Sequence, residues 1–236
     1  KDIPLAQKGL LTITQEDMNE LGFVALKGDF KVYDGLLYPT ELKDLDISFK
    51  LMTLEEIRKY NFPKGCITAT MTIFFKDINI NTLIIEELYT ANRVYVNNRL
   101  VSEMGIVSED RSQTLTQKKS DLVVLNSPIE NKVELVIQIA NHELISGQFE
   151  RNIFIGDFNS LSFFWNSRII TKFVTATAYF TMCFFFFGLF IKNRKYTYLL
   201  ALSIAGLLNC YIVLTAFEPI VIFKPTGIWY TINSML

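Results

Sequence analysis

Residues 173–191 read FVTATAYFTMCFFFFGLFI and contain 19 consecutive uncharged positions. At about 1.5 Å per residue, a helix of this length matches a hydrocarbon core of roughly 30 Å. A second uncharged run, TYLLALSIAGLLNCYIVLTAF, occupies residues 197–217. Buried core helices of a soluble protein are the alternative interpretation, but two such runs favour the membrane. We therefore predict membrane-spanning helices over 169–191 and 197–217.

The residues before these runs have the composition of a soluble domain. Residues 1–168 carry 18 of the 23 Lys and Arg and 23 of the 24 Asp and Glu, a net charge of −5. This mild acidity gives no reason to expect nucleic acid as a partner. Cys66 is the one cysteine in this part, which excludes a disulfide within it, and no metal-ligand spacing is present. We expect no cofactor and no metal.

A short basic segment separates the two apolar runs and predicts their orientation. Residues 192–196 read KNRKY and contain Lys192, Arg194 and Lys195. Basic residues in short loops stay on the cytoplasmic side of a membrane. We therefore expect a cytoplasmic loop here, and residues 1–168 on the outer side. Trp165 fits an aromatic belt at the membrane surface, and Lys172 can extend its amine toward the headgroups.

The two ends of the chain suggest a fragment. The sequence does not begin with Met and has no signal peptide, so we expect a processed or trimmed N-terminus. Residues 225–236 form a third uncharged run. We predict that they start a truncated third helix, which the natural protein would continue.

Residues 21–166 are predicted to form an antiparallel β-sandwich, with residues 1–20 as a lead-in. The stretch CITATMTIFFK, residues 66–76, alternates in period two as a half-buried strand does, and KVELVIQIA, residues 132–140, is similar. Asn97-Asn98 lies between two such runs and predicts a hairpin turn, because Asn tolerates positive φ. Many short strands with little helix favour a sandwich.

Two further segments connect the expected strands. TLEEIRKY, residues 53–60, predicts a short helix with Thr53 as N-cap and Glu56 completing a capping box. Residues 106–121 are rich in Ser, Thr, Gln and Lys, which predicts a solvated loop.

Three stretches carry a family resemblance: GFVALKGDFKVYDGLLYP (22–39), YTANRVYVNNRLVSEMGIVS (89–108) and VELVIQIANHELISGQFERNIFIG (133–156). With the apolar tail, they resemble bacterial seven-transmembrane receptors with diverse intracellular signalling modules, over roughly residues 20–236. The hairpin motif also occurs in jelly-roll domains of the galactose-binding type in glycosidases; its position before membrane helices is more specific. Phe30 stands where Trp is common in the family, and Asn97-Asn98 replaces Asn-Gly.

The resemblance implies a fold that is mainly β: a galactose-binding-like, antiparallel jelly-roll sandwich followed by transmembrane α-helices in the bacterial inner membrane. It further implies a sensor that binds a small ligand, such as a carbohydrate, and relays binding to a cytoplasmic histidine kinase or nucleotide cyclase. That module lies outside this chain, which we expect not to be an enzyme itself. Two alternatives stay open: a membrane-tethered carbohydrate-binding module of an enzyme or transporter, and a domain that pairs receptor subunits as a homodimer.

No catalytic constellation stands out. His142 is the only histidine, and a lone His in an Asn-His-Glu context favours a structural hydrogen bond over a Ser-His-Asp triad. The adjacent carboxylates Glu86-Glu87 and Glu109-Asp110 are interpreted as solvated faces, since glycosidase acid–base pairs meet in space rather than in sequence. We therefore assign no catalytic residues.

The ligand-binding candidates come from two places. One is the loop that contains Asn141, His142 and Glu143 and runs to Arg151, because polar groups on sandwich-end loops commonly build sites. The other is the pair Asn92 and Arg93, which could bind sugar hydroxyls. The structural alternative is that Arg93 pairs with a carboxylate and Asn92 closes a turn.

Several further residues are expected to be structural. The aromatic side chains of Phe23, Phe30 and Tyr33 are predicted to form core rather than a stacking platform. Asn209, polar at membrane depth, predicts a hydrogen bond between helices.

Overall fold

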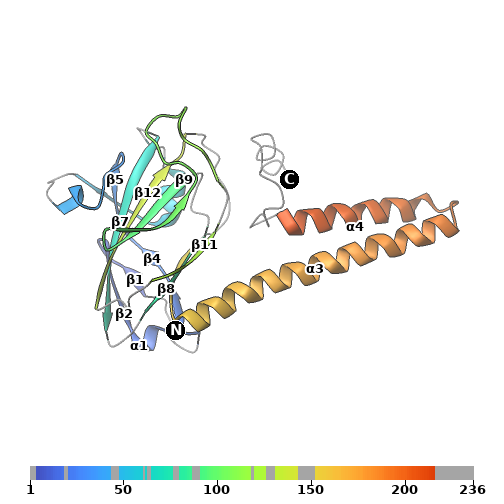
Figure 1. Cartoon of the computed structure of the whole chain (residues 1–236), viewed down its shortest axis with the longest axis horizontal. Coiled ribbons are helices and arrows are strands. Elements are labelled where there is room, and N and C mark those ends of the chain that lie inside the picture. Colours follow the sequence, from blue (N-terminus) through green and yellow to red (C-terminus); the bar gives the residue numbers. More distant parts are fainter. Residues whose placement is uncertain are drawn as a thin grey trace. The chain divides into compact units, whose positions relative to one another are not determined.

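The chain forms two units, which span residues 1–162 and 163–236 (Figure 1). The computed structural model describes residues 4–18, 21–43, 48–60, 62, 65–76, 80–86, 91–117, 120–125, 131–142 and 152–215. The first unit is built mainly from antiparallel strands and the second from helices. The prediction of a β-rich domain followed by two long apolar helices is therefore confirmed.

The larger sheet has seven strands, in the order β10-β9-β12-β7-β5-β6, with β2 also paired to β7. All its pairs are antiparallel except the parallel pair β2–β7. The strands are β2 (Leu10–Thr14), β5 (Phe30–Asp34), β6 (Lys50–Met52), β7 (Cys66–Lys76), β9 (Ala91–Val96), β10 (Arg99–Met104) and β12 (Lys132–Ala140).

The smaller sheet has four antiparallel strands in the order β11-β8-β13-β3. They are β3 (Phe23–Ala25), β8 (Thr82–Ile85), β11 (Asp121–Val124) and β13 (Ile153–Gly156). A short parallel pair joins β1 (Leu5–Ala6) to β4 (Lys27–Gly28). The described part of the unit also contains the short helices α1 (Gln15–Met18), the 3-10 helix η1 (Glu41–Lys43) and α2 (Leu54–Lys59).

One hydrophobic core takes side chains from both sheets. Ile67 and Ile137 of the larger sheet belong to the same buried cluster as Ile85 and Ile155 of the smaller one. Along β7 the core residues are spaced two apart, because successive side chains of a strand point to opposite faces. The strands predicted over 66–76 and 132–140 have the expected bounds.

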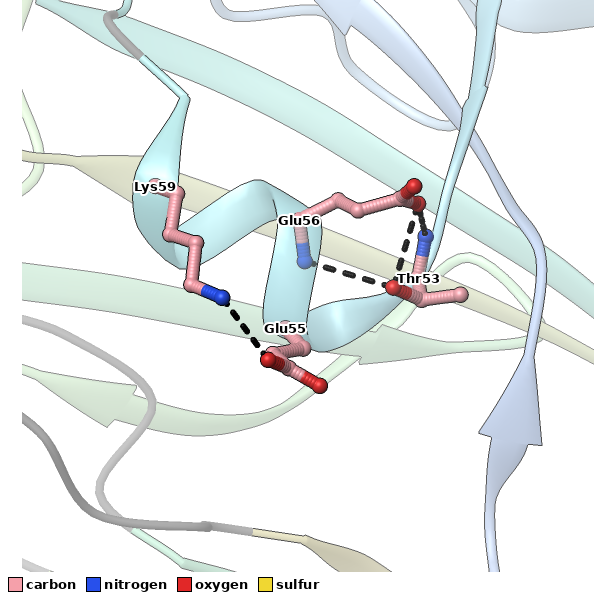
Figure 2. A network of polar contacts seen from close by, with 4 residues as sticks. All are labelled: Thr53, Glu55, Glu56 and Lys59. Atoms are coloured by element: carbon pink, nitrogen blue, oxygen red, sulfur yellow. Dashed lines mark hydrogen bonds and ion pairs between the residues drawn. The ribbon is translucent and has the colours of Figure 1, made fainter.

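The predicted hairpin and short helix are confirmed. Asn97 and Asn98 have φ values of 49° and 67°, and they join β9 to β10. Such positive φ at both positions is what a tight hairpin turn requires, and Asn tolerates it. In α2, the Thr53 side chain accepts a hydrogen bond from the Glu56 backbone, and the Glu56 carboxylate accepts one from the Thr53 backbone (Figure 2).

The N-terminal residues are more than a lead-in. Leu10–Thr14 form β2, and the side chains of Leu11 and Ile13 are buried in the core. The β unit therefore begins before residue 21. The sequence did not predict this strand because its partner, the second half of β7, lies about 60 residues further along the chain.

The prediction that three aromatic residues form core holds fully for Phe30, which is buried. Phe23 is half-buried and packs edge-to-face on Phe154. For Tyr33 the prediction was wrong, because β5 turns Phe30 and Val32 toward the core and Tyr33 to the opposite face.

The prediction that Glu86 lies on a solvated face was also wrong. Glu86 is buried, and its Oε2 accepts a 2.8 Å hydrogen bond from the Asn152 backbone.

The second unit contains most of α3 (Phe158–Lys192) and all of α4 (Thr197–Thr215). Both are long and apolar enough to cross a membrane, and the most apolar window of α3 is only 6% buried, unlike a soluble core helix. The helix around the first apolar run begins at Phe158 rather than at 169, so Trp165 lies inside it. The predicted third helix over 225–236 lies outside the described residues.

The two apolar helices approach each other at small side chains. Gly206 of α4 lies against the backbone of Tyr179 and Cys183, and Cys183 Sγ lies 3.3 Å from Ser203 Oγ. Small residues allow such close packing of membrane helices. Asn209 Nδ2 donates to Ala205 O in its own helix at 2.8 Å, and the hydrogen bond predicted between helices stays a prediction.

Candidate functional site

The larger sheet has a second face, which we call the outer face, opposite the core. Side chains that alternate with the core positions lie there, and the strand register sets them in rows. One row, read across β5, β7, β12, β9 and β10, consists of Tyr33, Thr68, Gln138, Arg93 and Glu103. The next row, which begins on β6, consists of Leu51, Lys31, Thr70, Val136, Tyr95 and Leu100.

One end of the first row carries an ion pair. Arg93 Nε donates to Glu103 Oε1 at 2.6 Å, and the two side chains are 23% and 40% exposed. Partial burial and a short distance hold both groups in place. The structural alternative for Arg93, a carboxylate partner across the sheet, is confirmed. The pair still presents free N–H donors and carboxylate lone pairs.

Asn92 points away from this row. It lies on the core side of β9, is 0% exposed, and its Nδ2 is 3.7 Å from Met104 Sδ. Its Oδ1 has no hydrogen-bond partner among the described residues. Since Asn92 belongs to a strand, it does not close a turn. Asn92 and Arg93 lie on opposite faces and cannot contact the same ligand.

Gln138 at the centre of the row was missed from the sequence. Its Nε2 donates to Leu37 O at 3.0 Å, while Leu37 N donates to Thr68 Oγ1 at 2.9 Å. Residues 35–38, which we call the covering segment, therefore lie over the middle of the outer face. Gln138 is 1% exposed, and its Oε1 has no hydrogen-bond partner within the described part of the chain. The sequence feature that could have identified Gln138 is a single amide side chain among the apolar residues of KVELVIQIA.

Aromatic rings lie on both sides of the covering segment. The Tyr33 and Phe49 rings are 6.0 Å apart, and Lys31 Nζ lies 5.2 Å from the Phe49 ring centre. On the other side, burial raises the pKa of the Tyr95 phenol, against an opposite effect of the Arg93 charge. The outer face thus combines flat apolar surfaces with hydrogen-bonding groups.

The predicted loop site lies at the end of the same sheet. Asn141 N donates to Gly65 O at 2.8 Å, and His142 Nε2 lies 3.1 Å from Ser108 O. These contacts tie the end of β12 to two neighbouring loops, which supports the structural interpretation of His142. Glu143 and Arg151 lie outside the described residues.

The neighbouring loop meets the covering segment. Glu109 Oε1 accepts a 3.4 Å hydrogen bond from Leu36 N. Glu109 and Asp110 are exposed, as predicted. Hydrogen bonds from Ser112 lower the pKa of the Asp110 carboxyl. Across the described ranges, no group of three or more His, Cys, Asp or Glu is placed to hold a metal ion.

No family model and no curated protein sequence matches the chain. Solved structures with some similarity include a glycosyl hydrolase family 2 member from Bacteroides cellulosilyticus, at 10% identity and a TM-score of 0.39, over 57% of this chain and 20% of that one. A β-glucuronidase of Bacteroides uniformis has 11% identity and a TM-score of 0.39, over 56% and 17%. A putative β-galactosidase from Bacteroides fragilis has 12% identity and a TM-score of 0.38, over 56% and 22%.

The chain therefore spans about a fifth of the length of these enzymes. With TM-scores below 0.5, the similarity carries no argument about the function of this chain.

Proposed function

We propose that the chain is the sensory and membrane-anchoring part of a bacterial receptor of the seven-transmembrane class with diverse intracellular signalling modules. Its β unit is proposed to be a galactose-binding-like jelly roll that binds a small, hydroxyl-rich ligand such as a carbohydrate. The observation that carries this proposal is the outer face, where a buried amide oxygen without a described partner lies between an aromatic pair and an ion pair.

The chemistry of the outer face fits a sugar. A buried acceptor without a partner is costly, and a ligand hydroxyl that donates to Gln138 Oε1 would remove that cost. The Arg93–Glu103 pair can both donate to and accept from further hydroxyls. The half-buried ring of Tyr33 and the exposed ring of Phe49 offer apolar surface to the C–H side of a sugar ring.

The same groups disfavour an anionic ligand. The Arg93 charge is already balanced by Glu103 at 2.6 Å. A carboxylate or phosphate supplies only acceptors, so it cannot satisfy Gln138 Oε1 and is repelled by Glu103. We therefore expect neutral sugars to bind in preference to uronic acids.

A ligand that reaches Gln138 has to displace Leu37. Two hydrogen bonds hold Leu37 itself, Leu37 N to Thr68 Oγ1 and Gln138 Nε2 to Leu37 O. The covering segment also makes hydrogen bonds through Gly35 and Leu36, and Leu36 packs against a small buried apolar cluster. At about 1 kcal/mol for each bond, the ligand has to supply several kcal/mol to displace the whole segment. Ligand binding would then select the conformation with the covering segment displaced, as a sensor requires.

The membrane part of the proposal depends on the helices and the loop between them. The apolar helices α3 and α4 supply the anchor. Lys192, Arg194 and Lys195 favour a cytoplasmic location for their connection and an outer location for the β unit. A cytoplasmic kinase or cyclase, outside this chain, would receive the signal.

Calorimetry of the full chain in detergent micelles tests the proposal. The panel contains neutral monosaccharides and oligosaccharides together with the matching uronic acids. We expect binding of a neutral sugar, with affinity reduced more than tenfold by Gln138→Met and by Tyr33→Ala. Gln113→Met, at an exposed turn, is the matched control and should leave affinity unchanged.

Two results would overturn the proposal. One is binding that Gln138→Met and Tyr33→Ala leave unchanged. The other is a failure of the whole panel to bind, with a stable homodimer in analytical ultracentrifugation, which would favour a subunit-pairing domain.

A further inference from the structure

The connection between the β unit and α3 is a single residue. Strand β13 ends at Gly156, and α3 begins at Phe158. Asp157, between them, accepts hydrogen bonds through Oδ2 from the backbone N–H groups of Asn159 at 3.0 Å and Ser160 at 3.3 Å. It thus caps the helix, and its negative charge lies at the positive end of the helix dipole.

The turn before β3 also contacts Asp157 and the start of α3. Asp157 N donates to Gly22 O at 3.0 Å. Gly22 has a φ of +70°, and a Cβ there would collide with the Ser160 side chain. A Cβ at Gly156 would lie 2.6 Å from Gly22 O. Gly22 is therefore required by its positive φ and by its close approach to the first helical turn, and Gly156 by the close approach of β13 to Gly22 and Phe23.

The first turn of α3 is also packed into the β unit. Leu161 is 0% exposed. Strand β13, which leads into the turn, is fixed at its start by the bond from Asn152 N to Glu86 Oε2 and is paired on both sides, to β8 and β3. The same helix then continues without interruption to Lys192 and contains the apolar run 173–191.

We infer that the first turn of α3 folds as part of the β unit, through a clamp formed by Gly22, Gly156, Asp157, Ser160 and Leu161. This inference goes beyond the ligand-binding proposal and does not depend on it.

Hydrogen–deuterium exchange of the full chain in detergent micelles tests the clamp. The amides of residues 159–162 should share the protection of β13 and lose it at the same urea concentration. Asp157→Ala should raise their exchange rate about fivefold, the effect expected for loss of an N-cap. Asp157→Asn, which keeps a capping oxygen, should change it far less.

A glycine pair supplies an independent comparison. Gly22→Ala should also raise exchange at 159–162, since the added methyl group displaces Ser160. Gly188→Ala, where no atom lies within 4 Å, should have no effect there. Rapid exchange at 159–162 in the unaltered chain while β13 stays protected would overturn the inference. Equal effects of Asp157→Ala and Asp157→Asn would overturn it as well.

Discussion

The two faces of the seven-stranded sheet are covered by different parts of the chain. The core face is covered by the smaller sheet, and apolar residues such as Met71 and Ile137 fill it. The centre of the outer face is covered by the segment 35–38, which several hydrogen bonds and the packing of Leu36 hold in place. Burial on the core face is thus maintained by side-chain packing, and at the centre of the outer face mainly by hydrogen bonds.

This difference shows why burial alone does not locate a site. Asn92 and Gln138 are buried amides, and each has an oxygen without a described partner. Asn92 lies within the packed core, where no ligand could reach it without opening the fold. Gln138 lies under the covering segment. The covering element therefore separates the two amides: one is enclosed between the sheets, and the other lies under a single stretch of chain.

The largest expected effect tests the core face. Ile137→Ala should lower the free energy of unfolding by about 2–5 kcal/mol, because it leaves a cavity between the sheets. Thr70→Ala, half-buried on the outer face, should change it by less than about 0.5 kcal/mol. Urea unfolding of the two variants measures the difference. Equal losses would show that the faces are packed alike.

Gln138→Met should cost less, about 1 kcal/mol, because it leaves the Leu37 carbonyl without its donor while it also removes the unpartnered oxygen. The same urea experiment applies. A loss as large as that of Ile137→Ala would mean that the covering segment is an integral part of the core.

Asn92→Leu should be close to neutral or stabilising by up to about 1 kcal/mol, since it replaces an amide whose oxygen lacks a described partner by an apolar side chain of similar size. A loss of several kcal/mol would instead reveal that Asn92 has a partner in a part of the chain that is not described.

The smallest effect concerns alkaline pH. Burial raises the pKa of Tyr95 in the folded protein, so the fold is favoured while the phenol stays protonated. That stabilisation is full below the unfolded pKa of about 10 and is lost as the pH rises through the folded pKa. Tyr95→Phe should therefore reduce the fall in melting temperature between pH 9 and 11. An unchanged pH profile would place Tyr95 in contact with water.

Local patterns in the sequence predicted the parts of the fold that depend on local chemistry. Period-two alternation located β7 and β12, two asparagines located the hairpin, and Thr53 with Glu56 located α2. The misassigned parts depend on distant partners. Asn92 and Arg93 are adjacent in the sequence, yet they lie on opposite faces of the sheet. Gln138 becomes a candidate only through its contact with Leu37, about 100 positions earlier in the chain.

The parallel pair β2–β7 has a consequence for how the polypeptide matures. Leu10 pairs with Thr72, so this strand emerges from the ribosome well before its partner exists. Until then its Leu and Ile side chains have no core to enter. A chain without its first 14 residues would leave one edge of the C-terminal half of β7 unpaired, and that open edge is a template for aggregation. Residues 10–14 thus protect β7 against association with other strands.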